Sequence, residues 1–182
     1  EAFTYYGHRE KLKLIGKEHL LESLQKNALK IAKAAADEFP ELNLMVAGNV
    51  ANTNIYDSAD RQSHIDCQKM FEEQIGWAKE AGVDFVIAET ISWTGEAQIA
   101  LKAIKDAGMI AVVNLAVPAG DKTRDGHSVG EACKILEYYG ADVVGLNCYR
   151  GPTMMKKLLP EIKKNVSCHV AVLPVPFRTN EK

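Results

Sequence analysis

The stretch FVIAETISWTGEAQIALKAIKDAGMIAVVNLAV, residues 85–117, decides the fold class. It opens with an apolar run at 85–91 and continues with a segment of helical period at 95–107. After Gly108 it closes with a second apolar run at 110–117. A strand, a helix that ends at a glycine and another strand together predict a βαβ unit with parallel strands. Continuous apolar runs are typical of strands covered on both faces.

The same alternation extends over the whole chain and predicts an α/β fold. We expect helices near residues 20–35, 61–80, 95–107, 129–139 and 153–165, and strands at residues 3–6, 44–50, 85–91, 110–117, 143–149 and 170–175. No linker or change of composition divides the chain, so we expect one domain over residues 1–182. Six strands and five helices fit either a doubly wound sheet or most of a (β/α)8 barrel, and length alone favours the sheet.

Composition excludes several classes of function. Among the 182 residues, 22 Lys and Arg stand against 24 Asp and Glu, a net charge of −2, so no basic field favours nucleic acid. The apolar runs are too short to cross a membrane, and the first residues lack the pattern of a secretory signal. Four unevenly spaced cysteines suit a reducing compartment, so we expect a cytoplasmic protein. The start without Met leads us to expect truncation.

Polar residues close several of the predicted strands. In parallel α/β folds ligands bind beyond the carboxyl ends of the strands, so these residues are the candidates for function. They are Tyr5, Tyr6, Asn49, Glu89, Thr90, Asn114, Asn147 and Cys148. The first strand-to-helix turn has no Gly-x-Gly-x-x-Gly or Gly-Lys-Ser/Thr motif, which argues against a nucleotide there.

Two of these residues carry reactive groups. Glu89 follows four apolar residues, and a desolvated carboxylate needs a cation, which could be a substrate ammonium, a metal or a neighbouring Arg or Lys. A salt-bridged structural glutamate is the alternative. Cys148 could be a nucleophile, a soft metal ligand or an inert buried thiol. Cys67, Cys133 and Cys168 lie where we expect structural cysteines, and no pair has Cys-x-x-Cys spacing.

Four motifs occur together in an order that resembles the homocysteine S-methyltransferase family. They are Met45-Val46-Ala47-Gly48-Asn49, Ala88-Glu89-Thr90-Ile91 followed by Glu96-Ala97, Gly145-Leu146-Asn147-Cys148 followed by Arg150-Gly151-Pro152, and Leu173-Pro174-Val175-Pro176. Phe3-Thr4-Tyr5-Tyr6 is most similar to the betaine–homocysteine type. The resemblance covers nearly the whole chain. It implies a (β/α)8 TIM barrel, of which strands 2 to 7 would be present, truncated at both ends.

The resemblance also implies a reaction and a site. Members of the family move a methyl group from a small donor to homocysteine, giving methionine, on a zinc ion held by three cysteines. Cys148 matches the first zinc ligand, and the other two are expected outside this sequence. Glu89 matches the glutamate that binds the homocysteine amino group, and Tyr6 matches a donor-pocket tyrosine. Thr90 replaces a second donor-pocket tyrosine and lacks its aromatic face, so the donor stays open between betaine, S-methylmethionine, another sulfonium and a folate. We expect Asn49 and Asn147 to help bind substrate.

Zinc coordination would favour the thiolate of homocysteine, but one cysteine cannot build the three-thiolate site. We therefore expect this chain to bind zinc weakly or not at all unless another chain supplies ligands. The unpaired edges of an open barrel predict association into homo-oligomers. Two other functions stay open. One is a zinc-free barrel enzyme that uses Glu89 as a general base, and the other is a non-catalytic module that binds an amino acid.

Overall fold

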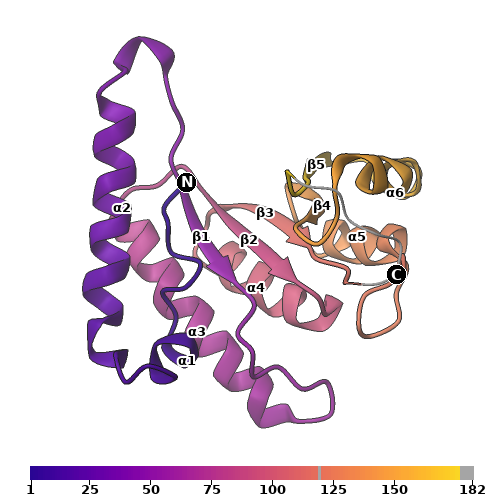
Figure 1. The fold of residues 1–182 in the computed structure, drawn as a ribbon, viewed down its shortest axis with the longest axis horizontal. Helices are drawn as coiled ribbons and strands as arrows, with labels where there is room; N and C mark the ends of the chain where they lie inside the picture. The colour runs from indigo at the N-terminus through magenta and orange to yellow at the C-terminus, as the bar shows by residue number, and fades with distance from the viewer. Residues whose placement is uncertain (119, 177–182) are drawn as a thin grey trace.

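The computed structural model describes residues 1–118 and 120–176. Within them, five parallel strands form one sheet in the order β1-β2-β3-β4-β5, so each strand pairs with the next strand along the chain (Figure 1). The strands are β1 (Ala47–Ala51), β2 (Phe85–Ile91), β3 (Ile110–Leu115), β4 (Val143–Asn147) and β5 (His169–Leu173).

Helices alternate with these strands. They are α1 (Arg9–Lys13), α2 (Leu21–Asp37), α3 (Arg61–Glu80), α4 (Thr94–Asp106), α5 (Val129–Tyr138) and α6 (Pro152–Asn165), with the short 3-10 helices η1 (Glu18–Leu20) and η2 (Pro40–Leu42). Local sequence sets several ends. The Asp60 side chain accepts from the backbone N–H of Gln62 at the start of α3, and Ser128 and Glu131 form a capping box at the start of α5.

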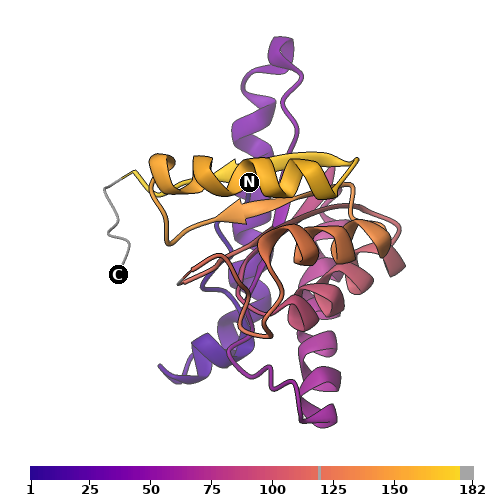
Figure 2. The same cartoon turned by 90° about the vertical axis from the view of Figure 1, so that its right-hand side faces the viewer.

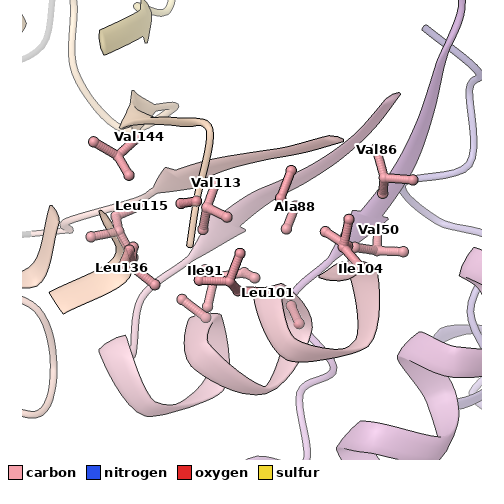
Figure 3. Packing of buried hydrophobic residues seen from close by; sticks show 14 of the residues in the cluster. Val50, Val86, Ala88, Ile91, Leu101, Ile104, Val113, Leu115, Leu136 and Val144 are labelled. Atoms are coloured by element: carbon pink, nitrogen blue, oxygen red, sulfur yellow. The ribbon is translucent and has the colours of Figure 1, made fainter. Parts of the chain in front are cut away.

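Helices α3 to α6 cover one face of the sheet. Each of them packs against the next, and Figure 2 shows α4, α5 and α6 following one another on the same side of the strands. The core lies between these two layers. Leu101 and Ile104 of α4 meet Val50, Val86 and Ala88 of the strands there (Figure 3). Sequential strand order with helices on one face is the arrangement of a barrel wall, whereas a doubly wound sheet carries helices on both faces. The fold is therefore α/β, a partial TIM barrel.

Four predicted helices and five predicted strands are confirmed within a few residues, and the α3 and β2 boundaries match the predicted ones. The prediction of a strand over residues 3–6 is wrong. Ala2 donates its N–H to Ala47 of β1, but the N–H of Thr4 turns back to Ala2 and that of Gly7 to Thr4. These turns use the backbone donors that a strand ladder needs, so the chain lies beside β1 without extending the sheet.

The helix expected near residues 20–35 is also confirmed, as α2, but only some of its apolar side chains are buried. α2 packs on α3 at the side of the molecule (Figure 1), where Leu21, Gln25 and Leu29 are buried. Leu24 and Ile31, which are also apolar residues of α2, remain 44% and 65% exposed. The period of the sequence located this helix, but it did not identify which side chains meet a neighbour.

Gly145 allows β4 and β5 to approach each other closely. A Cβ atom built on this residue would overlap the backbone carbonyl oxygen of Ala171 in β5. Backbone cannot move aside as the end of a flexible side chain can, so any side chain at position 145 would force the two strands apart.

None of the helices in the described residues is both long enough and apolar enough to cross a membrane.

Candidate functional site at the carboxyl ends of the strands

The Glu89 carboxylate lies at the centre of a hydrogen-bonded network that joins three strands. Asn49 of β1 donates its amide to Glu89 Oε1 at 2.9 Å, and Asn147 of β4 donates to Oε2 at 2.8 Å. The Asn49 amide also donates to the Glu1 side chain at 2.6 Å. Asn49, Glu89 and Asn147, three of the residues predicted from the strand ends, therefore meet at one edge of the sheet.

The side-chain amide of Asn147 forms hydrogen bonds through both its nitrogen and its oxygen. Besides Glu89, its amide donates to the Thr90 hydroxyl at 2.8 Å, and its carbonyl oxygen accepts the Thr90 N–H at 2.8 Å. Thr90 has a φ of 58°, in a region that β-branched residues rarely adopt, at an irregularity in the pairing of β2 with β3. Asn147 thus holds the backbone bend that directs Glu89 and Thr90 toward the strand ends.

Glu89 has no close cation to balance its charge. Burial raises the pKa of Glu89, and the nearby Glu1 carboxylate raises it further, while the two amides and the more distant Lys11 lower it. No ion pair within 4.0 Å involves Glu89 among residues 1–118 and 120–176. Of the partners expected for this carboxylate, a neighbouring Arg or Lys in contact is not found there. A ligand cation or a metal remains.

Cys148 follows directly after β4 and is half-buried. Its N–H donates to Leu173 of β5 at 3.2 Å, and Cys148 and Tyr149 have φ values of 59° and 51°. Two successive non-glycine residues in the left-handed region mark a strained turn, as is common at functional sites. The pKa of Tyr5 is raised by burial and then by the charge of Cys148, with a smaller effect from Glu89, so Tyr5 lies within electrostatic reach of both groups.

The other cysteines behave as structural thiols. Burial raises the pKa of Cys67 to about 11 and that of Cys133 to about 12, and burial also raises the pKa of Cys168. All four cysteines lie within the described residues and none forms a disulfide. No group of three or more His, Cys, Asp or Glu side chains that could hold a metal occurs in the part of the chain that the structure describes. Cys148 alone does not make a zinc site.

A cavity of about 280 Å³ opens beside this network. Thr90 lines this cavity and also takes part in the Glu89 network. Four aromatic rings contribute to the cavity wall. The lining residues are Tyr5, Asn52, Asn54, Tyr56, Thr90, Ser92, Trp93, Glu96, Arg124 and Tyr149. Tyr6 is 76% exposed and is not among them, although its ring packs against that of Tyr5. Its expected role at the donor pocket therefore stays a prediction.

Lys11 and Asn114 complete the surroundings. The Lys11 ammonium lies 3.8 Å from the centre of the Tyr5 ring and donates to the Tyr5 carbonyl oxygen at 2.8 Å, and burial lowers its pKa to about 8. Asn114 of β3 is buried, and neither polar atom of its side chain has a partner in the described structure. The strand-end pattern identified Asn114. It missed Lys11, Glu96 and Arg124, which lie on helices or in a loop.

Asp125, in the loop after β3, holds the cavity wall to the start of α4. One carboxylate oxygen accepts from the N–H and hydroxyl of Thr94, and the other accepts from the N–H of Gly95, each at 3.0 Å. Burial alone would raise the pKa of Asp125, but these hydrogen bonds and one from Thr123 lower it overall. Asp125 thus caps α4, whose own N-cap residue, Trp93, makes no side-chain bond.

Replacing Asp125 with asparagine should therefore destabilise the protein at pH 7 by about 1–2 kcal/mol. The amide nitrogen cannot accept the Gly95 N–H. Because the folded-state pKa is lowered, the stabilisation is present above the unfolded-state pKa and is lost as the pH falls through the folded-state pKa. Urea unfolding of both proteins should show a difference that shrinks below about pH 4, while the exposed Asp121→Asn has little effect. A difference that is independent of pH would contradict this account.

Comparison with known proteins identifies the family. The family model for homocysteine S-methyltransferase matches residues 1–181. Betaine–homocysteine S-methyltransferase 1 of Bos taurus is 29% identical over 98% of this chain and 45% of its own length. The Xenopus tropicalis protein of that name is 30% identical over 98% of this chain and 45% of its own length. The chain thus spans less than half the length of these two relatives.

Solved structures agree on the fold. The metallated form of the homocysteine methyltransferase MmuM from Escherichia coli superimposes with a TM-score of 0.79 at 17% identity, over 94% of this chain and 64% of that one. Its oxidised form gives a TM-score of 0.69 at 15% identity, over 95% and 73%. This likeness supports the partial barrel, and the sequence match extends over nearly all residues. The chain belongs to the homocysteine S-methyltransferase family.

Proposed function

We propose that this chain binds homocysteine and takes part in the transfer of a methyl group from a small onium donor to its sulfur, giving methionine. The observation that carries the proposal is the Glu89 carboxylate, which two amides orient and no described cation contacts. The ammonium group of an amino acid would supply the missing positive charge, and it would form a charge-assisted hydrogen bond in a partly desolvated site.

The position of Cys148 supports the second half of the proposal. Asn147 bonds to Glu89 and is followed directly by Cys148, so the carboxylate and the thiol lie at the same end of the sheet. In the reaction, the homocysteine thiolate forms a bond to the methyl carbon as the bond to the donor nitrogen or sulfur breaks. The electron pair of that bond stays with the donor, which leaves without its positive charge. Cys148 and Glu89 are the residues proposed to line this reaction.

The donor is proposed as an onium compound, of which betaine is one candidate. The two betaine–homocysteine S-methyltransferases compared above are 29% and 30% identical to this chain. Thr90 stands beside Glu89 where the resemblance expects a tyrosine, and a hydroxyl side chain lacks the aromatic face that attracts a quaternary ammonium. Another ammonium or a sulfonium compound therefore fits the proposal equally well.

Zinc enters the proposal only through Cys148, which we propose as one ligand of the family's metal site. The residues that the structure describes do not themselves complete such a site, so we assign no step of the reaction to the metal. We further propose that residues 1–182 form one domain that works in the cytoplasm. The free thiol state of all four cysteines, which lie in the described residues, is consistent with a reducing compartment.

Titration calorimetry of the purified chain under reducing conditions tests the proposal. We expect homocysteine to bind, and 4-mercaptobutanoate, which lacks the amino group, to bind at least about tenfold more weakly, because only homocysteine pairs with Glu89. Equal affinity for the two compounds would contradict an ammonium site at Glu89. Titrations with and without zinc separate a methyltransferase from a non-catalytic module, since a module that only binds an amino acid needs no metal.

A further inference from the structure

Glu96 is a buried carboxylate with one oxygen free to meet a ligand. It lies in the first turn of α4 and is 2% exposed. Its Oε1 atom accepts both the N–H and the hydroxyl of Thr53, each at 2.6 Å. Within the described residues, no hydrogen bond uses Oε2 and no Lys, Arg or His forms an ion pair with the carboxylate. A charge in this position is costly unless something balances it.

Glu96 lines the cavity beside the Glu89 network, together with the aromatic side chains of Tyr56, Trp93 and Tyr149. The rings of Tyr56 and Trp93 are neighbours, with centroids 5.7 Å apart. A volume of about 280 Å³ is slightly below that of drug-sized pockets, so the cavity suits a small molecule.

A carboxylate among aromatic rings selects one class of ligand. Aromatic faces attract organic cations, which are weakly hydrated, whereas a hard metal ion requires several oxygen ligands. Burial raises the pKa of Glu96, and the two hydrogen bonds from Thr53, followed by the charges of Lys11 and Arg124, lower it only in part. A ligand cation in the cavity would restore the balance by favouring the ionised carboxylate. Lys11 already lies over the Tyr5 ring, but no described cation lies over the rings of Trp93 or Tyr149.

We propose that Glu96 is the residue that recognises the positive charge of the methyl donor, and that the aromatic cavity around it is the donor's cation subsite. This inference rests on the proposed methyl transfer. Thr90 links the cavity to the Glu89 network, and Tyr149 follows Cys148, so a donor held there lies beside the proposed homocysteine site. Arg124, on the same wall, is the only described Arg or Lys that lines the cavity, and it is placed to meet a carboxylate on a zwitterionic donor.

This arrangement distinguishes substrate from product. A sulfonium donor becomes a neutral thioether when its methyl group leaves, so the attraction to Glu96 ends with the reaction. With a sulfonium donor, the carboxylate therefore contributes to binding of the donor and not to retention of the product, whereas the amine left by an ammonium donor takes up a proton and keeps its attraction to Glu96. Loss of its charge should raise the KM for the donor more than it lowers kcat.

The test is titration of the purified chain with tetramethylammonium, with 3,3-dimethylbutanoate as a probe that has the shape of betaine but no positive charge. Glu96→Gln removes the charge, yet its amide oxygen can still accept both Thr53 donors, so the fold should persist. We expect the Kd for tetramethylammonium to rise at least about tenfold, and the Kd for 3,3-dimethylbutanoate to change less than about twofold. The exposed Glu72→Gln is the matched control and should leave both unchanged.

A second variant tests the aromatic wall without changing any charge. An added Cβ at Gly95 would overlap the Tyr56 hydroxyl, so Gly95→Ala must shift the Tyr56 ring in the cavity wall. Binding of tetramethylammonium should weaken, and homocysteine binding should stay as in the wild type. If the wild type does not bind tetramethylammonium, or if Glu96→Gln binds it equally well, the proposal is wrong. Failure of the homocysteine site would instead appear as loss of homocysteine binding in the wild type.

Discussion

Glu89→Gln is expected to raise the Kd for homocysteine by about 100-fold, which corresponds to about 3 kcal/mol. The variant keeps the shape of the side chain but removes the charge that pairs with the substrate ammonium. The surrounding amides can adjust, because Asn49 Oδ1 has no hydrogen-bond partner in the described structure and can accept from the new amide after a rotation. The loss should therefore report on charge and not on a disrupted network.

The stability of Glu89→Gln should increase at pH 7, although its affinity for homocysteine falls. Because the folded-state pKa of Glu89 is raised, the favourable contribution of this group is fully present below its unfolded-state pKa and is lost as the pH rises through the folded-state pKa. At pH 7 the glutamine variant should therefore unfold at a higher temperature than the wild type, and the difference should shrink in acid. Thermal unfolding and calorimetry on the same samples measure both effects.

The binding and unfolding results together distinguish loss of the binding site from loss of the fold. Loss of binding with a higher melting temperature excludes unfolding as the cause, and the exposed Glu72→Gln should change neither quantity. Homocysteine binding to the wild type should also weaken in acid, beginning at a higher pH than for an ordinary glutamate, because the ammonium needs an ionised partner. Unchanged affinity in Glu89→Gln would rule out the proposed ammonium site.

Gly145→Ala is expected to destabilise the protein by about 3 kcal/mol, a fall in melting temperature of roughly 6–12 °C. The new methyl group would overlap the carbonyl oxygen of Ala171, so β4 and β5 must separate or lose their register. Asn147 and Cys148 end the displaced strand, and homocysteine binding should weaken along with stability. Thermal and urea unfolding provide the measurement.

Gly76→Ala is the control for the same chemical change. Gly76 lies inside α3, and a Cβ there would meet nothing within 4 Å. Alanine favours helix more than glycine does, so this variant should be more stable by about 0.5–1 kcal/mol. If Gly145→Ala lowers the stability and Gly76→Ala raises it, the loss at position 145 comes from the close approach of β4 and β5. A neutral Gly145→Ala would show that the two strands can separate at little cost.

Regular elements with strong local signals could be predicted from the sequence. The α3 and β2 boundaries were predicted correctly because polar and glycine residues flank a segment of helical period in α3 and an apolar run in β2. The strand over residues 3–6 could not be excluded, since its apolar and aromatic residues favour a strand, while turns that use its backbone donors decide otherwise. Propensity describes what a segment can form, and the hydrogen bonds of its neighbours decide what it does form.

The candidate site could be predicted where it lies on strands and not where it lies off them. Asn49, Glu89 and Asn147 meet because carboxyl ends of parallel strands share one edge. Glu96 was visible only as part of a motif, since a glutamate in the first turn of a helix is ordinary until its burial is known. The position of Lys11 over Tyr5 depends on the irregular path of the first residues, for which the sequence carries no period.

The sequential strand order has a consequence for how the protein is made. Each strand pairs with the one synthesised just before it, so contacts within the sheet span a helix and a loop and never the whole chain. Contacts of this span cost less loop entropy than pairings between distant parts of the described chain would, and during synthesis each of the strands β2 to β5 emerges when its partner is already in place. Among the described strands, the contact between β4 and β5 should then be the last to form.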